Sequence, residues 1–458
     1  MSTSADRKPR VITPALVAMC LAYFMVILDN TIVNVALPAL HHDLGASVTG
    51  LQWVVDGYLV MLAAGLLTGG ALADRFGARL VFQAGLGVFV VASLGCGLAP
   101  NTTILVIARL LQGVGAALSV PASLALLRVA FPDPSARARA IGIWGGIAGL
   151  AAATGPILGG VLVSEVSWRL VFFVNVPIGV AAMWLTAVRV PVAEGRPGRL
   201  DPAAQVIGVL ALAGLAFALI EGGHNGLTGP VIGAAALFVV AAAAFVLVEQ
   251  RVAEPMVPLR LFRHAGFSGG SVVGLLINLG FYGELFVLNL YFQQVLHFSA
   301  LLAGVALLPQ MAVVAAGSAL SGRFTARTGG PRATMLIGLV VGGIGLLGLV
   351  LAQPSGGYPL LLLPLIAAGF GMSFTMPAAT TAVVESAPDG RAGLASGVVN
   401  AARQVGGVVG IALLGALVSG TGAAFVSGLR VAMVLAGAAF LLGAVITAFT
   451  IRKSQSLT

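Results

Sequence analysis

Residues 26–40 read VILDNTIVNVALPAL and place an aspartate, Asp29, inside a stretch that is otherwise apolar enough to cross a membrane. A carboxylate at the centre of a membrane helix costs roughly 2.5 to 3.5 kcal/mol on insertion scales. Ionisable residues at that depth face a bundle interior or a water-filled cavity, and they usually mark a function. Asp29 is therefore expected to have a function. The alternative is a structural acid whose hydrogen bonds are satisfied by neighbouring Asn and Thr side chains.

The composition of the whole chain predicts a multi-pass membrane protein. Of its 458 residues, 59% are hydrophobic and 9% are charged, whereas about a quarter of the residues of a soluble protein are charged. The 62 glycines agree, because small residues let helices approach closely in lipid. The net charge of +9 comes from short clusters between apolar spans and not from one basic stripe, so no nucleic-acid partner is expected. Two cysteines inside apolar spans, Cys20 and Cys96, have no metal-ligand or redox spacing.

Fourteen apolar stretches are long enough, at about 20 residues each, to cross roughly 30 Å of hydrocarbon. They begin near Ile12, Leu51, Leu80, Thr102, Arg137, Trp168, Ala203, Thr228, Gly266, Ala300, Arg332, Tyr358, Arg391 and Arg430. Cytoplasmic loops are enriched in Lys and Arg, and twenty of the 24 basic residues fall on the side that holds both termini. Both termini are therefore expected in the cytoplasm. Arg109 and Arg403 are left within spans, and each needs a function or a partner.

Two longer connectors, RVPVAEGRPGRLDP after the sixth span and EQRVAEPMVPLRLFRHAG after the eighth, divide the chain. We expect an all-α integral membrane protein with an N-terminal six-helix bundle at 1–190. An inserted helix pair with cytoplasmic linkers is expected at 191–265, and a C-terminal six-helix bundle at 266–458. Six-helix halves of this kind are typical of secondary transporters built from repeats.

A cytoplasmic turn after the second span, GGALADRFGARL at 69–80, combines glycines with charges. Gly77 can adopt the left-handed conformation, and Asp74 can accept bonds from the N–H groups at a helix start. Such a cluster can latch one conformation of a two-state carrier, although an ordinary positive loop is the alternative. The latch residues would be Gly70, Asp74, Arg75, Gly77 and Arg79.

Two further spans carry distinctive residues. The stretch LVIARLLQGVGAAL at 105–118 buries Arg109, whose guanidinium needs carbonyl or carboxylate partners and is either a relay component or a structural anchor. The stretch GIWGGIAGLAAATGPILGGVLV at 142–163 places Gly155 and Gly159 on one helical face, where they permit close helix contact. Pro156 removes a backbone bond and favours a bend, so this helix is either a rocking surface or passive packing.

These stretches resemble the motifs of the major facilitator superfamily, and the third resembles its antiporter motif: Gly155, Pro156, Gly159 and Gly160. The sequences LDNTIVNVALPAL at 28–40 and WRLVFFVNVPIG at 168–179 resemble signatures of its fourteen-helix drug:proton antiporter branch. The resemblance covers essentially the whole chain, with two departures, Ala78 in the loop motif and Ala151 in the antiporter motif. It implies drug efflux coupled to proton entry, with Asp29 as the first-span acid, Asp74 as the loop acid and Arg109 as the buried arginine.

Candidate proton-coupling residues are Asp29, Asp56 and Glu284, with Arg109 beside them. Burial disfavours the charged form of a carboxyl group, so such an acid can be neutral when shielded and ionised when open to water. Asp56 shares a helical face with Gln52 and otherwise sits in interfacial water. The ninth span carries a stripe of polar residues at helical spacing, Asn278, Tyr282, Asn289 and Gln293. Glu284 lies on roughly the opposite face of that helix. Either the stripe or Glu284 therefore faces the cavity.

Candidate substrate-binding residues are polar or aromatic positions within spans. They are Asn34, Trp53, Glu221, Asn278, Tyr282, Tyr291, Asn400 and Arg403, and for each of them ordinary membrane packing or an interfacial position is the alternative.

The composition and this resemblance together imply a multi-pass carrier in the bacterial plasma membrane that exports lipophilic compounds, with cationic ones as an option, by alternating access. No enzyme activity, cofactor or metal is expected, since no nucleophile has catalytic partners and no GxxxxGK motif is present. The expected partners are a small-molecule drug, protons and the lipid bilayer, and the expected state is a monomer. A dedicated exporter of one endogenous metabolite or lipid, and a membrane sensor that binds ligand without transport, remain alternatives.

Overall fold

The computed structural model describes residues 13–190, 202–252, 255, 257, 259–354, 357–387, 392–418 and 422–451. Within these ranges helices account for nearly every residue, and there is no β-strand. Fourteen of the described helical segments are long and apolar enough to span a membrane. The predicted all-α architecture with fourteen spans is confirmed.

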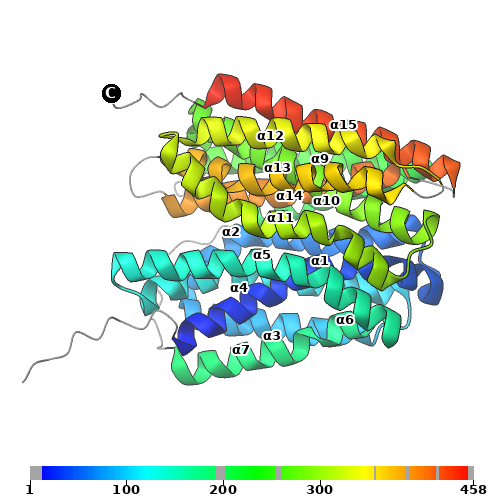
Figure 1. The fold of residues 1–458 in the computed structure, drawn as a ribbon. Helices are drawn as coiled ribbons and strands as arrows, with labels where there is room; N and C mark the ends of the chain where they lie inside the picture. The colour runs from blue at the N-terminus through cyan, green and yellow to red at the C-terminus, as the bar shows by residue number, and fades with distance from the viewer. Residues whose placement is uncertain are drawn as a thin grey trace, which may run out of the picture.

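Seven helices form the N-terminal half, in the lower part of Figure 1. They are α1 (Pro14–Leu44), α2 (Val48–Phe76), α3 (Ala78–Gly97), α4 (Thr102–Ala130), α5 (Pro134–Glu165), the short α6 (Leu170–Phe173) and α7 (Asn175–Arg189). Side-chain caps define several starts, because Thr13, Ser47, Asn101 and Asp133 each accept a hydrogen bond from a backbone N–H of the first turn. The sixth predicted span is thus divided between α6 and α7.

The C-terminal half lies in the upper part of Figure 1. It comprises α10 (Ala265–Leu290) with the π-helical turn η2 (Tyr291–Val295), α11 (Ala300–Arg327), α12 (Pro331–Gly348) with the 3₁₀ turn η3 (Leu349–Leu351), α13 (Tyr358–Glu385), α14 (Ala392–Ala416) and α15 (Ala423–Thr450).

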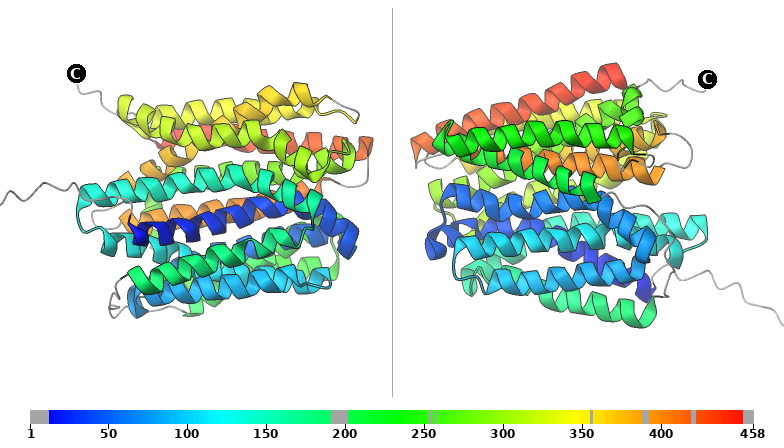
Figure 2. Two further views of the ribbon diagram at one scale, coloured as in Figure 1. Left: turned by 60° about the horizontal axis from the view of Figure 1, so that its bottom comes forward. Right: turned by 180° about the vertical axis from the view of Figure 1, so that it is seen from behind.

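Two helices between the halves, α8 (Pro202–Asn225) and α9 (Gly229–Arg251), form the predicted pair, followed by the short turn η1 (Leu259–Arg263). Helix α8 packs on α2 of the first half and on α14 of the second, while α9 packs mainly on α8 (Figure 2, right). Near the start of α8, Gln205 Nε2 donates to Ala64 O at 2.9 Å, and Thr68 donates to the Gln205 side chain. The pair therefore covers the seam between α2 and α14.

Several predicted features lie outside the described residues. They are the boundary segment 191–201 and the basic residues Arg7, Lys8, Arg10, Arg196, Arg199, Arg391, Arg452 and Lys453. The division at 190 and 265 and the cytoplasmic position of the termini stay predictions.

Contacts between the halves gather at the end of the molecule where α1 ends and α2 begins. Gln52 Nε2 donates to the carbonyls of Ile411 and Ala412 at 3.0 and 3.1 Å. Gln293 Nε2 donates to Val35 O at 3.1 Å, and Leu301 N donates to Ser164 Oγ at 3.2 Å. Toward the other end, a Cβ added at Gly142 of α5 or Gly322 of α11 would meet no atom within 4 Å. The two halves therefore interlock at one end.

Glycine allows helices to touch backbone to backbone within each half. Gly406 and Gly410 of α14 lie against the backbone of Leu275 and Leu279 in α10, so an added Cβ at either glycine would overlap it. Close approach of this kind is what holds membrane helices together in the absence of a hydrophobic driving force between them.

We expect Gly410→Ala to lower the free energy of unfolding by about 1–3 kcal/mol, because overpacking displaces α14 from α10. Thermal unfolding of the purified protein in detergent would measure this. The matched control is Gly142→Ala, which meets open space and should be neutral or stabilising by up to about 1 kcal/mol, since alanine favours the helix. Equal melting temperatures for the two variants would contradict the close packing of α14 on α10.

Candidate functional site

Asp29 lies at the centre of a buried polar cluster in the N-terminal half. Its Oδ2 accepts a hydrogen bond from Arg109 Nη1 of α4, with which it forms an ion pair. Its Oδ1 accepts from Gln112 Nε2 at 2.9 Å and from Asn175 Nδ2 of α7 at 2.8 Å. All four residues are fully shielded from solvent. Asp29 therefore has a cationic partner and two neutral ones, which offset the cost of burying its charge.

The Arg109 guanidinium is fixed by more than its acid. Its Nε donates to Val54 O of α2 at 2.8 Å, and its Nη1 also donates to Gln112 Oε1 at 2.8 Å. The Tyr58 ring lies 4.4 Å from the guanidinium carbon, within cation–π range. Ser93 of α3 extends the cluster, because its hydroxyl accepts from Gln112 Nε2 at 2.8 Å. Arg109 thus links α1, α2 and α4, with the carbonyl and carboxylate partners that its burial predicts.

Besides Asp29, the six-helix bundles bury two more carboxyl groups, and neither has a cationic partner among the described residues; Glu249 of α9 is also buried and accepts from Val257 N at 2.9 Å. Glu284 of α10 is fully buried, and both of its oxygens accept from Gln310 Nε2 of α11, at 2.9 and 3.0 Å. Asp56 of α2 is also fully buried, and within the described chain neither of its oxygens has a hydrogen-bond partner. Asp56 therefore lies in the protein interior and not in interfacial water, which was the alternative for this residue.

A second polar cluster lies between the halves, away from Asp29. Arg403 of α14 is half-buried, and its Nη1 donates a long bond of 3.4 Å to Asn400 Oδ1. Its guanidinium is within electrostatic range of the hydroxyls of Tyr282 in α10 and Tyr23 in α1. The Tyr23 ring stacks on Trp144 of α5, with centroids 3.7 Å apart and planes 11° apart. Four helices from both halves thus contribute to this cluster.

The last residues of the polar stripe of α10 face the other half, while Glu284 points into its own. Asn289 lines a cavity together with Asn34 and Val35 of α1, whereas Gly274, one turn before the buried Asn278, packs on the stem of Arg403 in α14 of the same half. Asn289 and Gln293 continue this face, and Gln293 reaches Val35 of α1. Asn289 and Gln293 therefore lie at the contact between the halves, and Glu284 does not.

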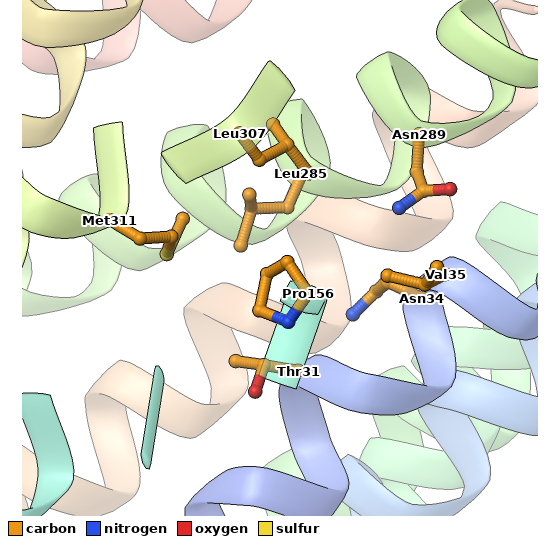
Figure 3. A pocket seen from close by; sticks show the side chains of 8 residues that line it. All are labelled: Thr31, Asn34, Val35, Pro156, Leu285, Asn289, Leu307 and Met311. Atoms are coloured by element: carbon orange, nitrogen blue, oxygen red, sulfur yellow. The ribbon is translucent and has the colours of Figure 1, made fainter. Parts of the chain in front are cut away.

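A small cavity of about 10 Å³, near the size needed for one water molecule, marks the interlocked end (Figure 3). It is lined from both halves, by Thr31, Asn34, Val35, Pro156, Leu285, Asn289, Leu307 and Met311. Asn34 Oδ1 and Asn289 Nδ2 are buried without a partner in the described chain. Asn34 thus lies at the contact between the halves.

The antiporter-motif glycines hold α5 against two neighbours at once. Side chains at Gly155 and Gly159 would collide with Thr31 and Ile32 of α1, so these glycines share one face, as their spacing predicts. Gly160 instead lies against Leu301 of α11, in the other half. Helix α5 continues unbroken through Pro156.

The loop-motif residues cluster where α2 ends. Gly77 has a φ of 91° and a ψ of 129°, so it has the positive φ that favours glycine but not the predicted left-handed helical turn. Arg79 Nη2 donates to Ala187 O of α7 at 2.7 Å, and a Cβ added at Gly70 would lie 3.9 Å from Pro121. Asp74 and Arg75 are exposed, and Asp74 accepts no hydrogen bond from the described residues; in particular, no side chain caps the start of α3.

Three predicted substrate residues lie away from the Arg403 cluster. Tyr291 is fully buried within the C-terminal half, where its hydroxyl donates to Gln353 O at 2.7 Å. Trp53 faces Phe217 of α8, with centroids 6.2 Å apart. Glu221 accepts a bond of 2.7 Å from Asn225 near the end of α8.

Sequence reasoning missed four contributors: Tyr23, Ser93, Asn175 and Gln310. Each is a polar residue within an apolar span, and Asn175 lies inside the stretch WRLVFFVNVPIG. Polarity at membrane depth is the signal that could have identified them.

We expect Asp29→Asn to lower the free energy of unfolding by about 3–5 kcal/mol, because it leaves Arg109 buried without its counter-charge. The double variant Asp29→Asn with Arg109→Gln should lose clearly less than the sum of the two single losses. Thermal unfolding in detergent gives all three values, with the exposed Asp74→Asn as a control near zero. Additivity within about 0.5 kcal/mol would show that the pair is not energetically coupled.

Comparison with known proteins agrees with this architecture. The family profile described as Major Facilitator Superfamily matches residues 19–411. A methylenomycin A resistance protein of Bacillus subtilis (strain 168) is 38% identical over 437 residues, which cover 94% of this chain and 92% of that one. A tetracenomycin C resistance and export protein of Streptomyces glaucescens is 39% identical, over 89% of this chain and 76% of that protein.

Among solved structures, the fold is similar to a bacterial homolog of the human lysosomal transporter Spinster in an inward-facing, unoccupied conformation. The TM-score is 0.70 at 18% identity, and the match covers 97% of this chain and 98% of that one. Fourteen apolar helices, the family match across most of the chain and relatives that are resistance and export proteins, not enzymes, lead to one assignment. This chain is a multi-pass membrane protein of the major facilitator superfamily.

Proposed function

We propose that this protein exports lipophilic, antibiotic-like compounds across the bacterial plasma membrane in exchange for protons. Relatives that are 38% and 39% identical over most of this chain are named for resistance to methylenomycin A and for resistance to and export of tetracenomycin C. Identity at that level over the whole length of both bundles supports efflux of a drug-like molecule.

The observation that carries proton coupling is that Asp56 and Glu284, the buried acids of the two bundles besides Asp29, have no cationic partner among the described residues. A charge in a low-dielectric interior without a counter-charge is costly, and proton binding removes it. Each group can bind a proton from one side and release it after the cavity opens to the other. Asp29 takes part through Arg109, because their ion pair joins three helices that must keep their spacing as the bundle moves.

Alternating access follows from where the two halves touch. The contacts through Gln52, Gln293 and Leu301 close one end, whereas at the other end Gly142 of α5 and Gly322 of α11 each face open space. We place the closed end outside the cell and the end with the Asp74 loop in the cytoplasm, following the distribution of basic residues. The units that rock are residues 1–190 and 266–458, in a monomer, with 191–265 as the inserted pair.

We expect Glu284→Gln and Asp56→Asn each to slow substrate-driven proton movement by about tenfold or more, equivalent to about 1.4 kcal/mol or more in the barrier. The measurement is a pH-sensitive dye inside proteoliposomes, with methylenomycin A and tetracenomycin C as test compounds. Substrate-for-substrate exchange without a pH gradient should persist, because it needs no net proton transfer.

Glu221→Gln is the matched control, since Glu221 lies at the end of α8 and bonds only Asn225 among the described residues. It should leave both measurements unchanged. Wild-type protein that binds a compound but moves neither it nor protons would favour a sensor instead. Full proton movement after replacement of Asp29, Asp56 and Glu284 together would refute proton coupling by these acids.

A further inference from the structure

We propose that the cluster between the two halves binds a planar compound that carries a negative charge, and that Arg403 is the residue that binds that charge. This inference rests on the proposed function, since it names the class of compound exported. It departs from the cationic option that the sequence left open for the cargo.

Arg403 is a charge in the middle of the membrane with no counter-charge. Among the described residues its only hydrogen-bond acceptor is Asn400 Oδ1, at 3.4 Å, and its Nε is buried without any partner. A guanidinium has five N–H donors and stays protonated. Most of its donors are therefore available to a ligand.

The buried acids of the described chain have other partners or lie at another level than Arg403; Glu249 of α9 accepts from Val257 N. Asp29 is paired with Arg109, and Glu284 accepts from Gln310. Asp56 lies on the same α2–α14 interface but has no hydrogen-bond partner. It lies on α2 between Gln52, which bonds Ile411 and Ala412, and Leu59, which lies 3.6 Å from an added Cβ at Gly407. Asp56 therefore lies opposite the part of α14 that follows Gly407, further along α14 than Arg403.

Arg403 points into the space between the halves. Gly407, one turn further along the same face of α14, lies against Tyr282 of α10 and Leu59 of α2. The stem of Arg403 lies against Gly274 of α10. The half-buried guanidinium end is thus bordered by both bundles, which is where an alternating-access carrier binds its cargo.

A flat surface and hydrogen-bonding groups adjoin this charge. Tyr23 stacks on Trp144 and is itself half-buried, so part of its ring stays accessible. Trp144 Nε1 is a buried donor without a partner, and Asn278 Oδ1 is a buried acceptor without one, both within the described chain. Aromatic faces favour offset stacking with a planar ligand, and the unpaired groups would bond its polar edge.

The charge of the ligand follows from electrostatics. An arginine binds a carboxylate through two parallel N–H···O bonds, and charge-assisted bonds are roughly twice as strong as neutral ones. A phenolate or enolate oxygen would accept from the same donors. A cationic compound would be repelled by Arg403, and Asp29 is already paired with Arg109.

The test compares a planar acid with its uncharged amide. Anthracenecarboxylate and anthracenecarboxamide would be titrated by calorimetry into the full-length protein in nanodiscs at neutral pH, where only the acid is charged. We expect the wild type to bind the carboxylate about tenfold or more tightly, as charge-assisted bonds predict. Arg403→Gln should bring the two affinities to within about twofold, and Arg403→Lys should retain part of the preference.

Retained binding of the amide shows that each variant is folded. Tyr23→Leu should weaken both compounds alike and keep their ratio, because it removes stacking and leaves the charge. Equal wild-type affinities, or an unchanged ratio in Arg403→Gln, would overturn the proposal. Neither result affects proton coupling, which the proteoliposome measurement decides separately, since binding in nanodiscs needs neither turnover nor a pH gradient.

Discussion

The cost of placing charge in a low-dielectric interior governs this structure. Asp29 is tolerated because Arg109, Gln112 and Asn175 supply one ionic and two neutral donors to it. These partners come from α4 and α7, so the acid can be satisfied only when the bundle is assembled. The cost of burying this acid in an isolated helix therefore favours the packed bundle. Removing either charge would leave the other buried without a partner.

Close approach of helix backbones at glycine is the second constraint on this structure. Gly155 and Gly159 let α5 press on α1 beside Thr31, and Gly160 lets the same helix press on α11. One helix therefore belongs to its own bundle by one face and forms the contact between bundles by another. Smooth faces of this type hold helices by van der Waals contact, which can be exchanged during rocking at less cost than buried ion pairs.

The sequence predicted the fold well because span length and apolar content are local properties, and all fourteen helices follow from them. It also identified Asp29, Arg109, Glu284 and Arg403, since a buried charge is conspicuous in one helix. It did not predict which groups pair. That Asn175 reaches Asp29, or Gln310 reaches Glu284, depends on how helices rotate against each other. Tyr291 and Trp53 were misleading for the same reason, because aromatic side chains pack equally well outside the site.

The two halves use one pattern with different chemistry. Asp29 and Asn34 in α1 are five residues apart, and so are Glu284 and Asn289 in α10. Five residues rotate a helix by about 140° beyond a full turn, so each asparagine faces the opposite half while each acid faces its own. The asparagines meet at the cavity of the closed end.

The acids differ in partner, a guanidinium for Asp29 and a neutral amide for Glu284. A carboxyl held by a permanent cation is suited to a fixed charge, whereas one held by an amide can gain and lose a proton without stranding a counter-charge. Of these two acids, Asp29 is therefore suited to holding its bundle together, and Glu284 has the environment that the proposed proton exchange requires.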